Sequence, residues 1–152
     1  MGHPRSMTSD GGFAVHLYKD HEQWSAFSLN GINAKVIQNI SDPHGIHTSL
    51  PLASGKSDIY LRLDKTGKPV QGRLYNGRLS AIDFDWGHDH YNNPAKGGNG
   101  QKFSKGVVHV QEYRFRKDGT VDRISQNARL MTNDEIKTYG PILKYFDPKI
   151  KF

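Results

Sequence analysis

Three short stretches decide the fold that this sequence predicts: Asp58-Ile-Tyr-Leu-Arg-Leu63, Arg78-Leu-Ser-Ala-Ile-Asp-Phe-Asp85 and Gly106-Val-Val-His-Val-Gln-Glu-Tyr113. Within each, apolar and polar side chains alternate, which is typical of a β-strand with one buried face. A fourth run, Gln71-Gly-Arg-Leu-Tyr75, precedes Asn76-Gly77, a residue pair that favours a type I′ hairpin turn. Together the four runs predict antiparallel strands joined in sequence order.

A further strand is expected after this group. Lys117-Asp-Gly119 predicts a turn, and Val121-Asp-Arg-Ile124 follows it as a short strand. The sheet should therefore be a meander of four or five strands.

The C-terminal part carries the signature of a helix start. Thr132 followed three residues later by Glu135 matches a capping box, so a helix should begin there. We expect it to run to about Tyr139 and to stop at Gly140-Pro141, with residues 145–152 extended.

The N-terminal part is less regular. Leu17, Trp24 and Phe27 lie at roughly helical spacing, and residues 33–40 fit either a helix or a strand. The expected fold class is α+β: N-terminal helices followed by a twisted antiparallel sheet and a short C-terminal helix.

Composition limits the class of protein. The chain has 152 residues, a formal net charge of +6 and no cysteine, which suggests one domain with an anionic partner and no disulfide or thiolate site. No apolar run approaches the length of a membrane span. Residues 1–7 lack the apolar segment of a signal peptide and are expected to be an expression remnant, leaving residues 8–152 as a single domain.

Potentially reactive side chains gather where strands meet a long loop, residues 92–106. Asp83 and Asp85 share one face of their strand, His88 and His90 follow in the loop, and His109 belongs to the next strand. A structural sheet does not require such a gathering, whereas acid/base or phosphate chemistry does.

These residue types suit RNA cleavage by attack of the 2′-hydroxyl group. We expect His88 and His109 to act as acid and base, in either order, with no metal or cofactor. Arg73 and Arg78 are expected to bind phosphate, and Asp83 or Asp85 to orient a histidine. The residues expected to contact RNA by stacking, hydrogen bonding or charge are Tyr75, His90, Lys102, Lys105 and Tyr113.

Other interpretations remain open at this point. Asp83, Asp85, His88 and His90 form a string that could bind a metal, which would make the protein a metal-dependent nuclease, for example a DNase. The two aspartates could instead pair with Arg73 and Arg78 as ordinary surface charges. The chain could also be a non-catalytic basic module that binds an acidic partner. Walker A, G-x-G-x-x-G, G-x-S-x-G and H-E-x-x-H motifs are all absent.

Residues 59–79, 82–90 and 108–113 resemble C-terminal toxin domains of bacterial polymorphic and contact-dependent toxins, within the barnase–EndoU–colicin-like ribonuclease group. The resemblance covers roughly residues 57–115, and the long loop and the additional His90 depart from it. The positions that match are Arg73, Tyr75, Gly77, Arg78, Asp83, Asp85, His88 and His109.

The resemblance implies a metal-independent ribonuclease that acts on a rival cell. Such a domain would be secreted as part of a larger bacterial protein and would act in the cytoplasm of the target cell. Its partners would be an RNA substrate and a cognate acidic immunity protein, and we expect it to be a monomer.

Overall fold

The structure is a computed structural model, and it describes residues 14–17, 22–39, 57–64, 66–76, 80–118 and 121–152. The main strands are β1 (Ala14–Leu17), β2 (Glu22–Leu29), β3 (Ile32–Asn39), β4 (Ile59–Leu63), β5 (Pro69–Asn76), β6 (Ser80–Asp85), β9 (His109–Phe115) and β10 (Val121–Arg123). The remaining elements are β7 (His90–Tyr91), a 3-10 turn (Pro94–Lys96), β8 (Lys102–Phe103) and helix α1 (Asn133–Phe146).

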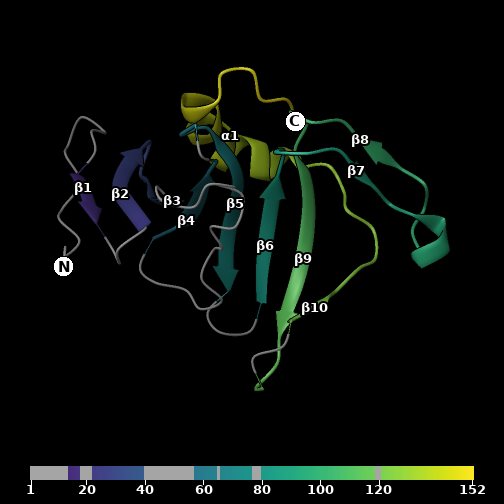
Figure 1. Cartoon of the computed structure of the whole chain (residues 1–152). Coiled ribbons are helices and arrows are strands. Elements are labelled where there is room, and N and C mark those ends of the chain that lie inside the picture. The colour runs from purple at the N-terminus through teal and green to yellow at the C-terminus, as the bar shows by residue number, and fades with distance from the viewer. Residues whose placement is uncertain (1–13, 18–21, 40–56, 65, 77–79, 119–120) are drawn as a thin grey trace.

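In the described part of the chain, the eight main strands form one sheet in the order β1-β2-β3-β4-β5-β6-β9-β10 (Figure 1). Neighbouring strands are antiparallel except β3 and β4, which run parallel. The strands from β4 to β10 form the predicted antiparallel meander, interrupted only by the excursion of β7 and β8. The α+β class and the C-terminal helix are thus confirmed. The predicted number of four or five strands is wrong, because β1, β2 and β3 extend the sheet to eight strands in the described part of the chain. The turns expected at Asn76-Gly77 and at residues 117–119 lie partly outside the described residues.

The predicted N-terminal helices are wrong, because the described residues before position 40 form β1, β2 and β3. The spacing of Leu17, Trp24 and Phe27 was misleading, because Leu17 belongs to β1 and the other two to β2. In β2, the consecutive residues Ala26 and Phe27 are buried on opposite faces of the sheet. A hairpin signal was present at Asn30-Gly31, between the paired residues Leu29 and Ile32. Both turn residues have positive φ, 52° and 79°, as a type I′ turn requires.

The two faces of the sheet are buried to different extents. The main core lies on the face covered by α1, where Ile59 and Leu61 of β4, Phe84 of β6 and Val110 of β9 pack with Leu143. On the opposite face, the buried apolar cluster is small and consists of Ala26, Ile37 and Tyr60, with Tyr75 beside it. The remainder of that second face is available for polar side chains.

Helix α1 begins as predicted and ends later than predicted. Thr132 Oγ1 accepts a hydrogen bond from the Glu135 backbone N–H, and a Glu135 carboxylate oxygen accepts one from the Thr132 N–H, completing the capping box. The helix continues through Pro141 to Phe146, so the predicted stop and the extended form of residues 145–146 are wrong. A proline inside a helix costs about 3 kcal/mol. Burial of Ile142 and Leu143, at about 1.5–3 kcal/mol each, offsets this cost.

The long segment after β6 is an ordered arm that projects beyond the β9 side of the sheet (Figure 1). In it, β7 and β8 pair as a short antiparallel hairpin around the 3-10 turn. Near its base, Val107 forms a bridge with Lys151 of the C-terminal tail. Among the described helices, none has the length and apolar character needed to cross a membrane.

Candidate active site

The candidate site lies on the sheet face opposite α1, where cross-strand pairing aligns polar side chains in rows. One row runs Arg62–Gln71–Asp85–His109 across β4, β5, β6 and β9. Residues paired across neighbouring strands lie side by side on the same face. The pairing register therefore brings the Asp85 carboxylate beside the His109 imidazole at the end of β6.

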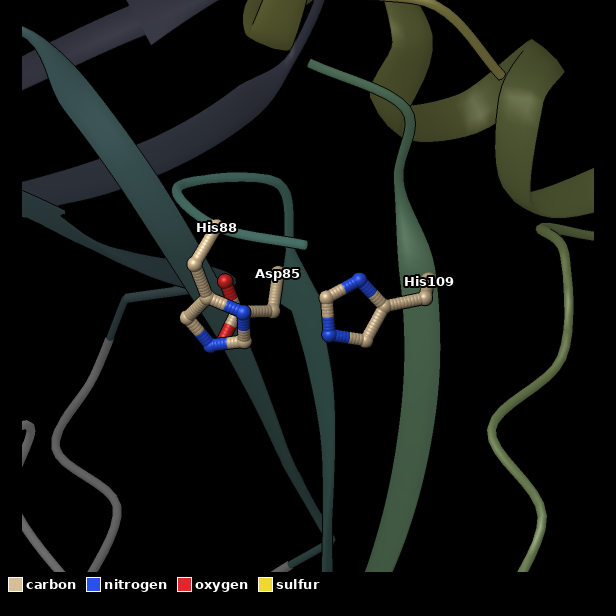
Figure 2. A group of neighbouring side chains, drawn as sticks. All are labelled: Asp85, His88 and His109. Carbon is tan, nitrogen blue, oxygen red and sulfur yellow. The ribbon is translucent and has the colours of Figure 1, made fainter. Parts of the chain in front are cut away.

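His88 folds back over this row to complete a three-residue cluster. Figure 2 shows Asp85 at the end of β6, His88 in the loop that follows, and His109 reaching toward both from β9. One potential ligand atom from each of the three side chains lies within 4.8 Å of the other two. The closest approach is 3.3 Å, between His88 Nε2 and Asp85 Oδ2.

Both ring nitrogens of His88 face oxygen atoms. Nδ1 lies 2.8 Å from the backbone carbonyl of Asp89, to which it donates, while Nε2 faces Asp85. Asp85 also accepts a hydrogen bond from the Gly87 backbone N–H through Oδ1, which fixes the carboxylate. His88 has a side-chain exposure of 57%, so its ring is open to solvent.

His109, by contrast, is almost fully covered, with 1% of its surface exposed. His90 stacks on it at 4.6 Å between ring centroids, and Phe103 of β8 lies 5.6 Å away. Burial, together with the nearby His90 and His88 rings, lowers the pKa of His109 to about 3, although the backbone of Val107 acts in the opposite direction. The ring is therefore neutral near pH 7.

The neighbouring row of the sheet is structural. Arg73 binds Asp83 through two hydrogen bonds, Nε to Oδ1 at 2.5 Å and Nη2 to Oδ2 at 2.9 Å, and Gln71 donates to Asp83 as well. Burial alone would lower the pKa of Arg73, but the hydrogen bond and charge of Asp83 outweigh burial and raise it. Asp83 thus holds Arg73 in the sheet face, as the alternative of an ion pair across the hairpin had it, and the pair is largely buried.

The arm is held against the sheet by Asn92, which is 1% exposed. Its side chain accepts from the Ala128 backbone N–H and donates to the Ala128 carbonyl, both at 2.9 Å, and its Oδ1 accepts from His90 Nε2 at 3.1 Å. At Gly98, a Cβ atom would lie 2.4 Å from the Asn92 backbone, so only glycine fits there. These contacts set the position of the His90 ring over His109.

A cleft of roughly 720 Å³ opens beside His88. Its lining includes the basic residues Arg62, Lys68 and Lys105, together with Asp64 and the buried Trp86. Burial lowers the pKa of Arg62, while the charges of Asp85 and Asp64 act to raise it. The charged residues of the lining are mainly basic, which suits an anionic ligand such as a phosphodiester.

The structure therefore brings together part of the predicted site. Asp85, His88, His90 and His109 form one group, and Lys105 lines the adjoining cleft. Arg73 and Asp83 lie one row away in their ion pair, and Arg78 lies outside the described residues.

The expected RNA-contacting tyrosines and Lys102 occupy other positions. Tyr113 donates its hydroxyl hydrogen to Gln111, and burial raises its pKa. Tyr75 packs edge-on against Tyr60 at 5.0 Å, and burial raises its pKa to about 12. Lys102 lies over the Tyr91 ring on the arm and does not line the cleft.

Sequence reasoning missed Arg62, Lys68 and Trp86 as cleft residues and Asn92 as the residue that holds the arm. Arg62 alternates with Leu61 and Leu63, so its polar orientation was visible. Its place beside Asp85 depends on the pairing of β4 with β5 and of β5 with β6, which periodicity does not give.

Comparisons with known proteins add no relative. A scan against protein-family models and searches of curated proteins and of solved structures gave no match.

Proposed function

We propose that this chain is a nuclease domain that cleaves RNA at the cluster of Asp85, His88 and His109. The observation that supports this most directly is the convergence of a carboxylate and two imidazoles beside a cleft lined by Arg62, Lys68 and Lys105. Imidazoles and carboxylates transfer protons near neutral pH, and cationic side chains stabilise a phosphorane.

The reaction proposed is transesterification at phosphorus. The 2′-oxygen forms a bond to phosphorus and loses its proton to a base, while the bond from phosphorus to the 5′-oxygen breaks and that oxygen gains a proton. His88 is the group in the cluster that solvent can reach, and its Nε2 is the atom at which a proton can be taken or released. The Asp89 carbonyl fixes the ring orientation, and Nε2 lies 3.3 Å from Asp85 Oδ2.

The metal-free pairing of His88 with His109 stays a prediction. The low pKa of His109 supplies a neutral imidazole, as a base requires. However, the ring is 1% exposed, so direct contact with substrate requires the arm that carries His90 to move. His109 is better suited to act through Asp85 and His88 than to touch RNA itself.

The wider biological setting is also proposed. A net charge of +6 suits both an RNA substrate and an acidic immunity protein. We infer an antibacterial toxin domain, monomeric, delivered by a larger secreted protein and active in the cytoplasm of the target cell. Its support is the charge together with the resemblance at residues 57–115.

The test is incubation of the purified protein with total bacterial RNA and, separately, with plasmid DNA. We expect RNA to be cut and plasmid DNA to remain intact. His88→Ala should lose at least about 100-fold in rate while remaining folded, because His88 is an exposed general acid/base. Lys102→Ala, an exposed arm substitution outside the cleft, is the matched control and should retain activity.

Two results would contradict the proposal. Full activity of folded His88→Ala would remove the assigned site. Failure to cut either nucleic acid, with tight RNA binding that survives His88→Ala, would favour the non-catalytic binding module instead.

A further inference from the structure

Three metal-type donor atoms already converge on one point of the candidate site. Asp85, His88 and His109 each place one such atom within 4.8 Å of the other two. The distance between His88 Nε2 and Asp85 Oδ2 is 3.3 Å. Two ligand atoms of a tetrahedral zinc ion, each about 2.0–2.1 Å from the metal, lie about 3.3–3.4 Å apart. The distance between His88 Nε2 and Asp85 Oδ2 therefore already fits two zinc ligands.

The ring of His88 is oriented as a metal ligand would be. Its Nδ1 donates to the Asp89 backbone carbonyl, which leaves Nε2 facing the carboxylate. Metal-binding histidines usually donate their second ring N–H to a carbonyl or carboxylate in this way. An imidazole lone pair and a carboxylate oxygen repel one another at 3.3 Å unless a proton or a metal cation lies between them.

His109 supplies an independent observation. It is 1% exposed, and its ring reaches from β9 toward Asp85 and His88 (Figure 2). A base must contact the substrate, whereas a metal ligand need not, so metal binding explains why this imidazole is aimed at Asp85 and His88 from a covered position.

We propose that Asp85, His88 and His109 form a binding site for one divalent transition-metal ion. Two imidazoles and one carboxylate suit zinc and its neighbours in the first transition row better than magnesium or calcium, which prefer oxygen ligands. Three protein ligands leave a coordination position open beside the exposed ring of His88, next to the basic cleft. In that position the ion would hold a phosphate oxygen, a role that rests on the proposed nuclease function. While the ion is bound, His88 Nε2 holds the metal and does not transfer a proton.

The binding test uses zinc chloride alone as the probe. The full chain, freed of metal by EDTA and dialysed, is titrated with zinc by calorimetry or against a chromophoric chelator. We expect the wild type to bind one equivalent that His88→Ala weakens on the order of 100-fold or more, since loss of a ligand should cost at least as much as loss of an outer-shell partner. His88 is exposed, so this variant should fold. Lys96→Ala, an exposed substitution in the 3-10 turn of the arm that touches none of the three ligands, is the control and should retain the site.

An activity measurement separates this inference from the proposed function. Cleavage that is lost in EDTA and restored by zinc or manganese supports both the metal site and the nuclease function. Cleavage that persists in EDTA overturns the catalytic role of the metal and leaves the nuclease proposal intact. One equivalent of zinc bound through His88, with no cleavage of RNA or DNA, overturns the nuclease proposal and leaves the metal site intact. Zinc binding that is equal in the wild type and His88→Ala overturns the site.

Discussion

His90 lies nearly parallel to His109, with ring centroids 4.6 Å apart and ring planes 12° apart. The stack covers one side of His109, while His88 lies 5.3 Å from its ring on another. A positive charge on either neighbour opposes protonation of His109. The arm that carries His90 therefore acts on the electrostatics of the cluster as well as on its access to solvent.

Replacement of His90 by phenylalanine tests this electrostatic effect. The aromatic stack is kept and one ionisable ring is removed, so we expect the pKa of His109 to rise from about 3 but to stay below the ordinary value of 6.5, because burial is the larger cause of the shift. Titration of the His109 ring signals by NMR measures the change. An unchanged pKa would mean that the charge on His90 has no influence on His109.

His109 should also make the stability of the fold depend on pH. Its pKa is about 3 when folded and 6.5 when unfolded, so between these values the unfolded chain holds a proton that the folded chain does not. The free energy of unfolding should therefore fall as pH drops below 6.5, by up to about 1.4 kcal/mol per pH unit down to about pH 3. Above pH 6.5 the contribution of His109 to the free energy of unfolding should not change with pH.

Urea denaturation of the wild type and of His109→Gln at a series of pH values isolates this contribution. Carboxylates titrate in both proteins, so the difference between the two curves reports His109. A difference curve that is level between pH 6.5 and 4 would contradict the low pKa.

The ion pair of Arg73 and Asp83 predicts a loss of stability. The two side chains are 13% and 4% exposed, so Asp83→Ala removes the carboxylate that balances a buried guanidinium charge. Removing one member of a buried pair costs about 3–5 kcal/mol. Arg116 and Asp122 form an exposed pair, and Asp122→Ala should cost less than about 1 kcal/mol.

Chemical denaturation of these two variants gives the comparison directly. Combining Arg73→Met with Asp83→Leu should recover much of the stability, because no unpaired charge remains buried. If Asp83→Ala instead kept full stability and lost only activity, Asp83 would belong to the catalytic site, as first expected from the sequence.

Local patterns predicted the parts of the fold that local interactions determine. Alternation identified β4, β6 and β9, and the Thr132–Glu135 capping box identified the start of α1. The end of α1 could not be read in the same way, since burial of Ile142 and Leu143 in the core outweighs the breaking effect of Pro141. β2 was missed, and residues 33–40 were left open between a helix and a strand, although Asn30-Gly31 marked the hairpin of β2 and β3.

The candidate site was likewise predicted only where local sequence patterns determine it. The clustering of histidines and aspartates pointed to Asp85, His88 and His109. Alternation placed Asp83 and Asp85 on one face but could not give them different roles. The strand register distinguishes the two aspartates, because Asp83 lies opposite Arg73, whereas Asp85 lies opposite Gln71 and His109. A shift by two residues exchanges these partners without changing the hydrophobic pattern.

Asn92 should control both the stability of the arm and the environment of His109. Asn92→Ala removes the partners of the Ala128 N–H and carbonyl and of the His90 ring. Unpaired buried groups cost about 1–3 kcal/mol each, so we expect a loss of about 2–5 kcal/mol by denaturation, together with faster hydrogen exchange at the Ala128 amide. Asn92→Asp keeps an acceptor for the Ala128 N–H but loses the donor to its carbonyl, so its loss of stability should be intermediate.

Asn99 is exposed and contacts Asn92 through one hydrogen bond, and Asn99→Ala is the control with a small expected effect. A change in the pKa of His109 in Asn92→Ala should match that of His90→Phe in direction, because both reduce the effect of the His90 charge on His109. Equal stability of Asn92→Ala and Asn99→Ala would show that the arm is held by other contacts.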